Sequence, residues 1–215
     1  ETEDFLMGRH LVASLGWSDT SFGADRDALI YFGSISQGFG SMSGNALQFG
    51  IAVNGRIESG NAANSLAQVF ARYYRKQSEK RLFFASMRAT AGLELDLDNL
   101  VRLGGDTGLR GFPLRYQNGE SSFVATLEQR YYTNWYPFRL FRVGGAVFAD
   151  AGRVWGESPV GEERLDWLAD AGLGLRLAFT RSASSKVVHI DVAFPLNGDP
   201  SIDSVQFLVE SRQSF

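Results

Sequence analysis

Apolar residues alternate with small or polar residues along residues 47–57, which read LQFGIAVNGRI. Successive side chains of a β-strand point to opposite faces, so Leu47, Phe49 and Ile51 share one apolar face. The stretch is longer than an ordinary soluble strand of about five or six residues. It matches the roughly 9 to 11 residues of a tilted transmembrane strand. The pattern therefore predicts a long strand with one apolar face.

The same alternation recurs along nearly the whole chain. It predicts ten strands, at residues 5–17, 27–39, 46–58, 65–76, 81–95, 121–134, 138–154, 167–180, 185–195 and 204–215. Short connections near residues 76–80, 134–137 and 181–186 alternate with longer polar ones near 18–26, 96–119 and 156–166. An even strand number with alternating short and long connections is typical of an outer-membrane β-barrel.

A soluble β-sandwich or a lipocalin-like barrel would also alternate, but two features favour the membrane. The small or polar face carries charged residues: Arg56, Arg72, Arg88, Glu94, Glu128, Arg130, Asp150, Arg176, Asp191 and Glu210. All four tryptophans lie at expected strand ends, as in the aromatic girdles of barrels: Trp17, Trp135, Trp155 and Trp167. We therefore expect an all-β, antiparallel transmembrane barrel of about ten strands, forming one domain over residues 1–215.

Composition narrows the remaining classes of protein. The 215 residues carry a net charge of -3 and no cysteine, which argues against a nucleic-acid partner and excludes disulfides and thiolate sites. No run of apolar residues approaches the roughly 18 to 20 that a membrane-spanning helix needs. The first residues, Glu1 to Asp4, do not resemble a signal peptide, so any leader has been removed or lies outside this sequence.

The most specific stretch is residues 103–112, which read LGGDTGLRGF. It resembles the superfamily of outer-membrane assembly barrels and two-partner-secretion transporters, also called bacterial surface antigens. The family hallmark is Arg-Gly-Phe or Arg-Gly-Tyr after an apolar residue, matched here by Leu109, Arg110, Gly111 and Phe112. The resemblance implies that this long loop folds back into the barrel lumen.

Two further motifs of that superfamily follow on later expected strands. An aromatic residue, Asp and Gly occur as Phe148, Asp150 and Gly152, and a Glu two residues before an Arg occurs as Glu128 and Arg130. Both carboxylates fall on the expected lumen face, and a guanidinium can bind a carboxylate through two hydrogen bonds. We therefore expect Arg110 to contact Asp150, with Glu128 nearby.

The resemblance covers residues 80–215 and includes the C-terminus. Phe215 ends the chain on the same strand face as Phe207 and Val209, which is similar to the signal that directs outer-membrane proteins to assembly. Family barrels usually have sixteen strands and follow periplasmic domains. We therefore expect a shortened member without those domains, a homodimer in which two copies cooperate, or a fragment.

No catalytic set is evident, and neither a metal site nor a cofactor is expected. The two histidines, His10 and His189, lie on separate expected strands. His189 and Asp191 share the lumen face, where polar pairs are ordinary filling. The glycine-rich loop lacks the Gly-Lys-Ser/Thr ending of a phosphate loop, and no Gly-x-Ser-x-Gly elbow is present.

The sequence thus predicts an integral barrel of the bacterial outer membrane, related to machinery that inserts or translocates proteins. Its expected partners are outer-membrane lipid and unfolded client proteins. Two alternatives stay open: a passive structural or anchoring barrel, for example of a patatin-like protein, and a narrow pore for small solutes.

Overall fold

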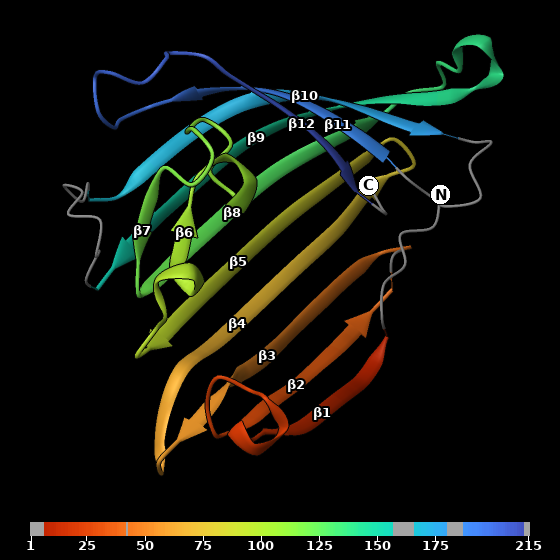
Figure 1. Ribbon diagram of the computed structural model, residues 1–215. Coiled ribbons are helices and arrows are strands. Elements are labelled where there is room, and N and C mark those ends of the chain that lie inside the picture. The colour runs from red at the N-terminus through yellow and green to blue at the C-terminus, as the bar shows by residue number, and fades with distance from the viewer. Residues whose placement is uncertain (1–6, 42, 157–165, 180–186, 213–215) are drawn as a thin grey trace.

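The computed structural model describes residues 7–41, 43–156, 166–179 and 187–212. Ten strands form one sheet, and every neighbouring pair in it is antiparallel. The strands lie in the sheet in their order along the chain. They are β1 (Gly8–Ser18), β2 (Ala28–Gly40), β3 (Asn45–Glu58), β4 (Asn61–Ser78), β5 (Arg81–Leu93), β8 (Ser121–Tyr132), β9 (Phe141–Trp155), β10 (Leu168–Phe179), β11 (Val187–Pro195) and β12 (Gln206–Arg212). Figure 1 shows the sheet curving into a deep trough.

The all-β, antiparallel prediction is confirmed, since each expected segment overlaps one strand of this sheet. Two short strands that alternation does not predict, β6 (Val101–Leu103) and β7 (Gln117–Gly119), pair as a separate hairpin. The strands β1 and β12 stand at the two ends of the sheet order. Closure into a barrel and the barrel's strand number stay predictions. In the part of the chain that the structure describes, no helix is long and apolar enough to cross a membrane.

Tight turns explain why neighbouring strands can pair over most of their length. Between β3 and β4 the chain reverses through Ser59 and Gly60 alone, with φ of 50° and 85°. Positive φ at both residues is the two-residue hairpin turn whose twist matches that of paired strands, and glycine adopts it without strain. The β3–β4 register then places Ile51 opposite Val69 and Gln48 opposite Arg72.

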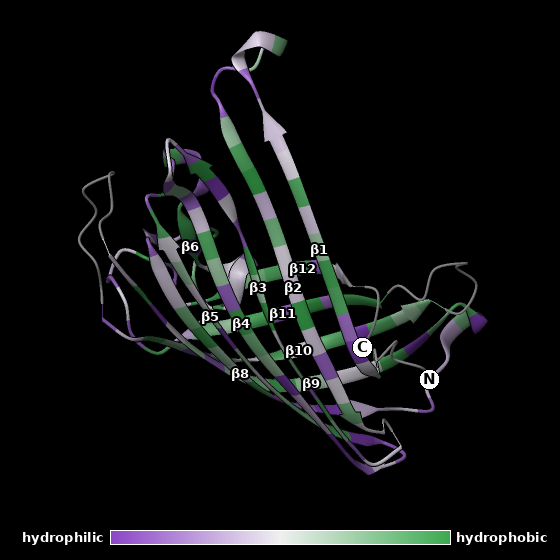
Figure 2. Cartoon of the chain, turned by 90° about the horizontal axis from the view of Figure 1, so that it is seen from below, coloured by the Kyte–Doolittle hydropathy of each residue, from purple (hydrophilic) through white to green (hydrophobic). Residues whose placement is uncertain are grey.

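The two faces of the sheet differ in chemistry. We call inner the face against which residues 96–120 pack, and outer the opposite face. The outer face exposes large apolar side chains on successive strands, including Leu15, Ile35, Phe49, Ile51, Val69, Met87, Leu127, Val147, Leu173 and Phe207. Figure 2 shows apolar and polar residues alternating along the strands, as the sequence pattern predicts.

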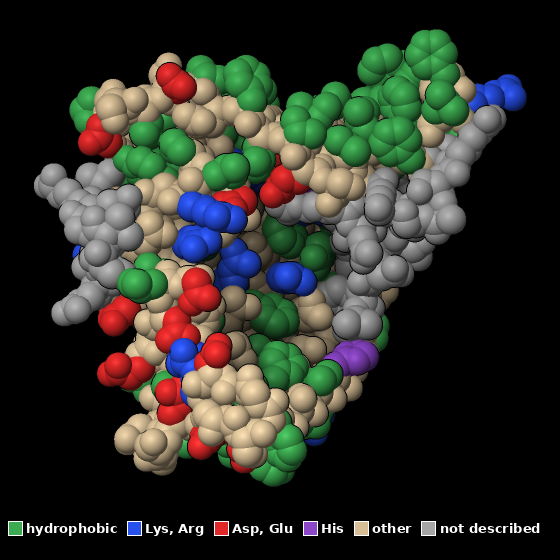
Figure 3. All heavy atoms as spheres, viewed as in Figure 1, with side chains coloured by type: hydrophobic (Ala, Val, Ile, Leu, Met, Phe, Trp, Pro, Cys, Tyr) green, Lys and Arg blue, Asp and Glu red, His purple; other side chains and the backbone are tan. Residues whose placement is uncertain are grey.

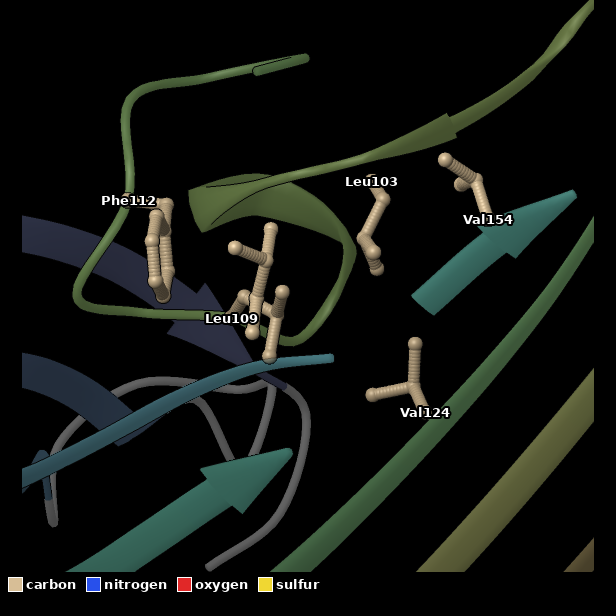
Figure 4. Packing of buried hydrophobic residues seen from close by; sticks show 6 residues of the cluster. Leu103, Leu109, Phe112, Val124 and Val154 are labelled. Carbon is tan, nitrogen blue, oxygen red and sulfur yellow. The ribbon is translucent and has the colours of Figure 1, made fainter. Parts of the chain in front are cut away.

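The buried apolar core lies between the loop of residues 96–120 and the inner face, rather than between two sheets. Its members come from the loop and from β8, β9 and β10: Leu103, Leu109, Phe112, Val124, Val154 and Leu168. Figure 4 shows Leu103 and Leu109 of the loop on the side nearer to Val124 and Val154 of the strands, with Phe112 farther along the loop. Fully burying one such side chain contributes about 1.5–3 kcal/mol, so this contact is a substantial reason for the loop to stay on the sheet.

Candidate functional site

The loop between β5 and β8 is held in one conformation by its own backbone. The β6–β7 hairpin forms its base, and a 3₁₀ turn (η3, Gly105–Thr107) follows Gly104. The Leu109 amide donates to the Gly104 carbonyl at 3.0 Å, and the Phe112 amide donates to the Leu109 carbonyl at 3.1 Å. This second bond closes a turn, so Arg110 and Gly111 project at the tip of the loop.

Arg110 is buried against the inner face and bound by carboxylates from three strands. Its Nε donates to Oδ2 of Asp150 at 2.8 Å and its Nη2 to Oδ1 of Asp150 at 3.0 Å, which is the bidentate geometry. Its Nη1 donates to Oε2 of Glu128 at 2.8 Å and to Oδ2 of Asp191 at 3.3 Å. The expected contacts with Asp150 and Glu128 are therefore present, and Asp191 is a third partner.

The ring of Phe148 forms the remaining contact of the Arg110 guanidinium. Cζ of Arg110 lies 3.3 Å from the ring centroid, so the cation stacks on the aromatic face while its edge is bound by carboxylates. Phe148 and Asp150 alternate with an outward residue on β9, which places both side chains on the inner face. The aromatic-x-Asp spacing of the sequence thus supplies both the ring on which Arg110 stacks and the carboxylate that binds it through two hydrogen bonds.

Two more arginines, Arg130 and Arg176, bind two of these carboxylates, those of Glu128 and Asp191. Nε of Arg130 donates to Oε1 of Glu128 at 2.8 Å, and Nη2 of Arg176 donates to the same oxygen at 3.2 Å. Arg176 also pairs with Asp191 through Nη1. We call these six side chains the arginine–carboxylate cluster: Arg110, Arg130, Arg176, Glu128, Asp150 and Asp191. All six are buried, and their three positive and three negative charges balance.

Charge balance matters here because an unpaired ion is costly to bury. Removing one partner of a buried pair typically destabilises a protein by about 3–5 kcal/mol, since the remaining charge is left without compensation. The partners come from the loop, β8, β9, β10 and β11. The arginine–carboxylate cluster therefore fixes the loop tip to four strands and favours one position of the loop.

Gly111 is required by close packing at the tip. A Cβ atom built at Gly111 would lie 2.4 Å from Cβ of Asp170 and 3.1 Å from the backbone nitrogen of Pro195. Such distances leave no room for any larger residue without moving the loop. At Gly152 on β9 an added Cβ would lie 2.8 Å from the backbone oxygen of Phe123 on β8, but at ordinary contact distances from Leu103 and Leu109, 3.4 and 3.5 Å. Gly111 thus lets the loop tip approach the sheet, whereas Gly152 is required by the close approach of the neighbouring strand.

Leu109 and Phe112 flank Arg110 and bury their side chains in the apolar core described above. Leu109 has no exposed surface, and the ring of Phe112 stacks at a tilt with Tyr116, their centroids 5.4 Å apart. All four residues of the Leu109–Phe112 motif therefore have a role in docking the loop: two apolar contacts, one charge and one close approach.

Three residues of the site escaped the sequence analysis in this role. Arg176 and Asp191 carry the correct strand parity, but parity does not reveal that they meet Glu128 and Arg110. Asp170 is fully buried, lies opposite Asp150 in the β9–β10 register and packs against Gly111. The available signal was an acidic residue of inward parity on β10. Its significance depends on strand register, which the sequence does not show.

Two residues of the expected assembly signal, Phe207 and Val209, lie on the outer face of β12, opposite to the face that carries the cluster, and both are largely exposed. Phe215 lies outside the described residues, so its part in the expected assembly signal stays a prediction. His189 and Asp191 share the inner face of β11 as expected. Asp191 belongs to the arginine–carboxylate cluster, where it accepts hydrogen bonds from Arg110 and Arg176.

The arrangement can hold a loop in place through charge-assisted hydrogen bonds. Guanidinium groups are charged at all accessible pH values and their carboxylate partners only accept hydrogen bonds. The cluster therefore acts as a structural support of the inner face, placed where an expected lumen would be.

Comparison with known protein families gives one match. The family model of the Omp85 superfamily domain matches residues 30–208, which include the arginine–carboxylate cluster and nine of the ten strands of the sheet in whole or in part. Neither a search of curated proteins nor a search of solved structures finds a match.

Proposed function

We propose, from the premise that this chain belongs to the Omp85 superfamily, that it is an integral outer-membrane protein that helps to insert or translocate other proteins. Members of this superfamily are transporters or insertases rather than enzymes. The observation that carries the proposal is the docking of Arg110 on Asp150, Glu128 and Asp191. We assign no catalytic role to any residue.

The outer face supports a lipid environment. It exposes large apolar side chains on strand after strand, with Trp17, Trp155 and Trp167 at one end and Trp135 at the other. A soluble protein rarely exposes contiguous apolar patches beyond a few hundred Å². An apolar face of this extent is therefore expected to be in contact with lipid or with another protein. Amphipathic rings prefer the headgroup level of a bilayer. We therefore propose outer-membrane lipid as the partner of this face.

A sheet in hydrocarbon must also satisfy its edges. Unpaired backbone groups cost several kcal/mol each in lipid, so strands span membranes only as closed barrels. The free edges of β1 and β12 are thus proposed to be paired in the membrane, within one domain or through a second copy. The part of the inner face left open by the loop is the proposed route or docking surface for an unfolded client.

The test is the folding of a client in liposomes. The barrel is reconstituted, an unfolded outer-membrane protein is added, and its folding is followed by gel shift with time. An insertase folds the client faster than empty liposomes do. Arg110→Ala should weaken this acceleration, because removing the guanidinium leaves three carboxylates without their shared cation.

Arg115→Ala is the matched control. Arg115 belongs to the same loop, is exposed, and reaches Asp106 only at 3.9 Å, so its loss should leave client folding unchanged. A folded wild-type barrel that gives no acceleration would overturn the proposal and favour a passive anchor. Equal losses in both variants would show that the arginine–carboxylate cluster has no specific part in the activity.

A further inference from the structure

A cavity of about 450 Å³ opens on the inner face beside the arginine–carboxylate cluster. It lies between β4, β5 and β8 and is bounded on one side by Asp106, Thr107 and Gly108 of the loop. Figure 3 shows basic side chains gathered in this hollow of the inner face. The volume is within the range of about 300–1,000 Å³ of pockets that take small ligands.

Two arginines of neighbouring strands face this cavity. The β4–β5 register places Arg72 opposite Ser86, two residues from Arg88, so the two guanidinium groups are diagonal neighbours on one face. Both side chains belong to exposed residues, unlike the buried arginines of the cluster. Two positive side chains on one wall of a cavity favour an anion placed between them.

Each of the two arginines has a neighbour that holds it at the cavity. Cζ of Arg72 lies 5.1 Å from the centroid of the Phe70 ring, and both residues line the cavity. Nη2 of Arg88 donates to the Thr107 carbonyl at 2.6 Å, which ties Arg88 to the loop. Arg72 has no acidic partner among the residues that the structure describes.

The charge of the cavity wall is positive. Arg110, Arg130 and Glu128 also line it, but their charges are compensated within the arginine–carboxylate cluster. Outside that cluster, Arg72 and Arg88 line the cavity against one carboxylate, that of Asp106. Asp106 lies on the loop side, near Arg115. A concave site lined mainly by one sign of charge concentrates counter-ions.

We propose that this cavity binds a small solute carrying phosphate or carboxylate groups, whose oxyanions bridge Arg72 and Arg88. The guanidinium fork matches the planar oxygens of such groups. The rings of Phe70 and Tyr74 on the same wall supply apolar contact for the organic part of the solute. This site is separate from the proposed client-folding activity, because it needs neither client nor membrane insertion.

The experiment is isothermal titration calorimetry on the folded chain in a neutral maltoside detergent, with inorganic pyrophosphate as one probe and citrate as the other. At low salt we expect saturable binding with a dissociation constant below about 1 mM. Arg72→Gln should raise that constant about tenfold or more, since it removes a charge-assisted contact. Salt at about 0.5 M should weaken binding by screening.

Arg75→Gln is the matched control on the same strand. Arg75 lies opposite Phe83 and outside the cavity, so its loss should leave the dissociation constant unchanged. Arg88→Gln is a second cavity variant and should resemble Arg72→Gln. Absence of saturable binding of both probes to the wild-type chain overturns the proposal. So does an equal weakening by Arg72→Gln and Arg75→Gln, which would show a non-specific charge effect.

Discussion

The inner faces of the two halves of the sheet have the same alternating pattern but opposite environments. On β8 to β11 the inward residues Glu128, Asp150, Arg176 and Asp191 are buried, because the loop of residues 96–120 covers them. On β1 every residue from Gly8 to Trp17 is exposed on both faces. Figure 1 shows the loop lying over β8 and β9 and leaving β1 to β3 uncovered. The curvature of the sheet by itself therefore buries few inward side chains. In β8 to β11 they are buried because the docked loop packs on them.

The covered half also differs in its chemistry. It holds balanced buried ions and the apolar core, whereas the inner face of the open half carries small polar residues such as Ser14, Ser34 and Ser36. Apolar side chains on this open inner face, such as Val12 and Phe32, keep about half of their surface, 54% and 41%. Stability should therefore depend strongly on inward residues in one half and weakly in the other.

The largest expected effect is the loss of charge balance in the covered half. Glu128→Gln keeps the shape of the side chain but removes the charge shared by Arg110, Arg130 and Arg176. We expect the free energy of unfolding to fall by about 3–5 kcal/mol, as for other broken buried pairs. Urea unfolding of the micelle-bound protein measures it. Glu79→Gln, at an exposed turn, is the control and should leave the midpoint unchanged.

The second-largest effect is expected where the loop tip packs closely against the sheet. Gly111→Ala places a Cβ 2.4 Å from Cβ of Asp170, and relieving such overlap typically costs about 1–3 kcal/mol. We expect the loop to lift, so that trypsin cuts after Arg115 faster than in the wild type. Gly44→Ala, where an added Cβ meets nothing within 4 Å, should leave the cleavage rate as it is. Unchanged cleavage in both variants would contradict the close approach.

Two valines on the same face of the sheet provide a direct comparison of the halves. Val124 on β8 is 7% exposed and belongs to the apolar core, whereas Val12 on β1 is 54% exposed. Val124→Ala should cost about 1.5–2 kcal/mol for two lost methylene equivalents, and Val12→Ala less than about 0.5 kcal/mol. Equal costs would mean that the open inner face is covered in the folded protein, by lipid, a client or a second copy.

The smallest effect concerns an ion pair between β3 and the start of the loop. Arg56 donates to both carboxylate oxygens of Asp96, at 2.6 and 2.9 Å, and these hydrogen bonds hold the pKa of Asp96 below its ordinary value of 3.8. Because the folded-state pKa is depressed, the stabilisation is present above pH 3.8 and is lost as the pH falls through the folded-state value.

Asp96→Asn tests this contact. The variant should be slightly less stable than the wild type at pH 7, by a small amount because both side chains are partly exposed to solvent, 15% for Arg56 and 38% for Asp96. The difference should shrink toward pH 3, as the wild-type carboxylate becomes protonated. Thermal unfolding at the two pH values measures it. A difference that grows on acidification would contradict the depressed pKa.

The sequence by itself determined the strands, their faces and part of the site. A period of two follows from the geometry of an extended backbone, so alternation locates strands such as β3 and β9 and assigns each side chain to a face. The Arg110 contacts with Asp150 and Glu128 could be anticipated because family motifs and inward parity agreed. Local pattern was enough for the strands and their faces, whereas the contacts of Arg110 also depended on the resemblance to a known family.

Only the tertiary structure decided which inward residues are buried and which of them meet. Arg110 and Asp191 are 81 residues apart and touch because β11 stands two strands from β9 in the sheet. Asp170 reaches Gly111 for the same reason, through its register opposite Asp150. Parity fixes the face of a strand on which a side chain lies, but burial depends on what packs against that face. In this protein the covering element is one loop, and its docking position is set by charges gathered from four strands.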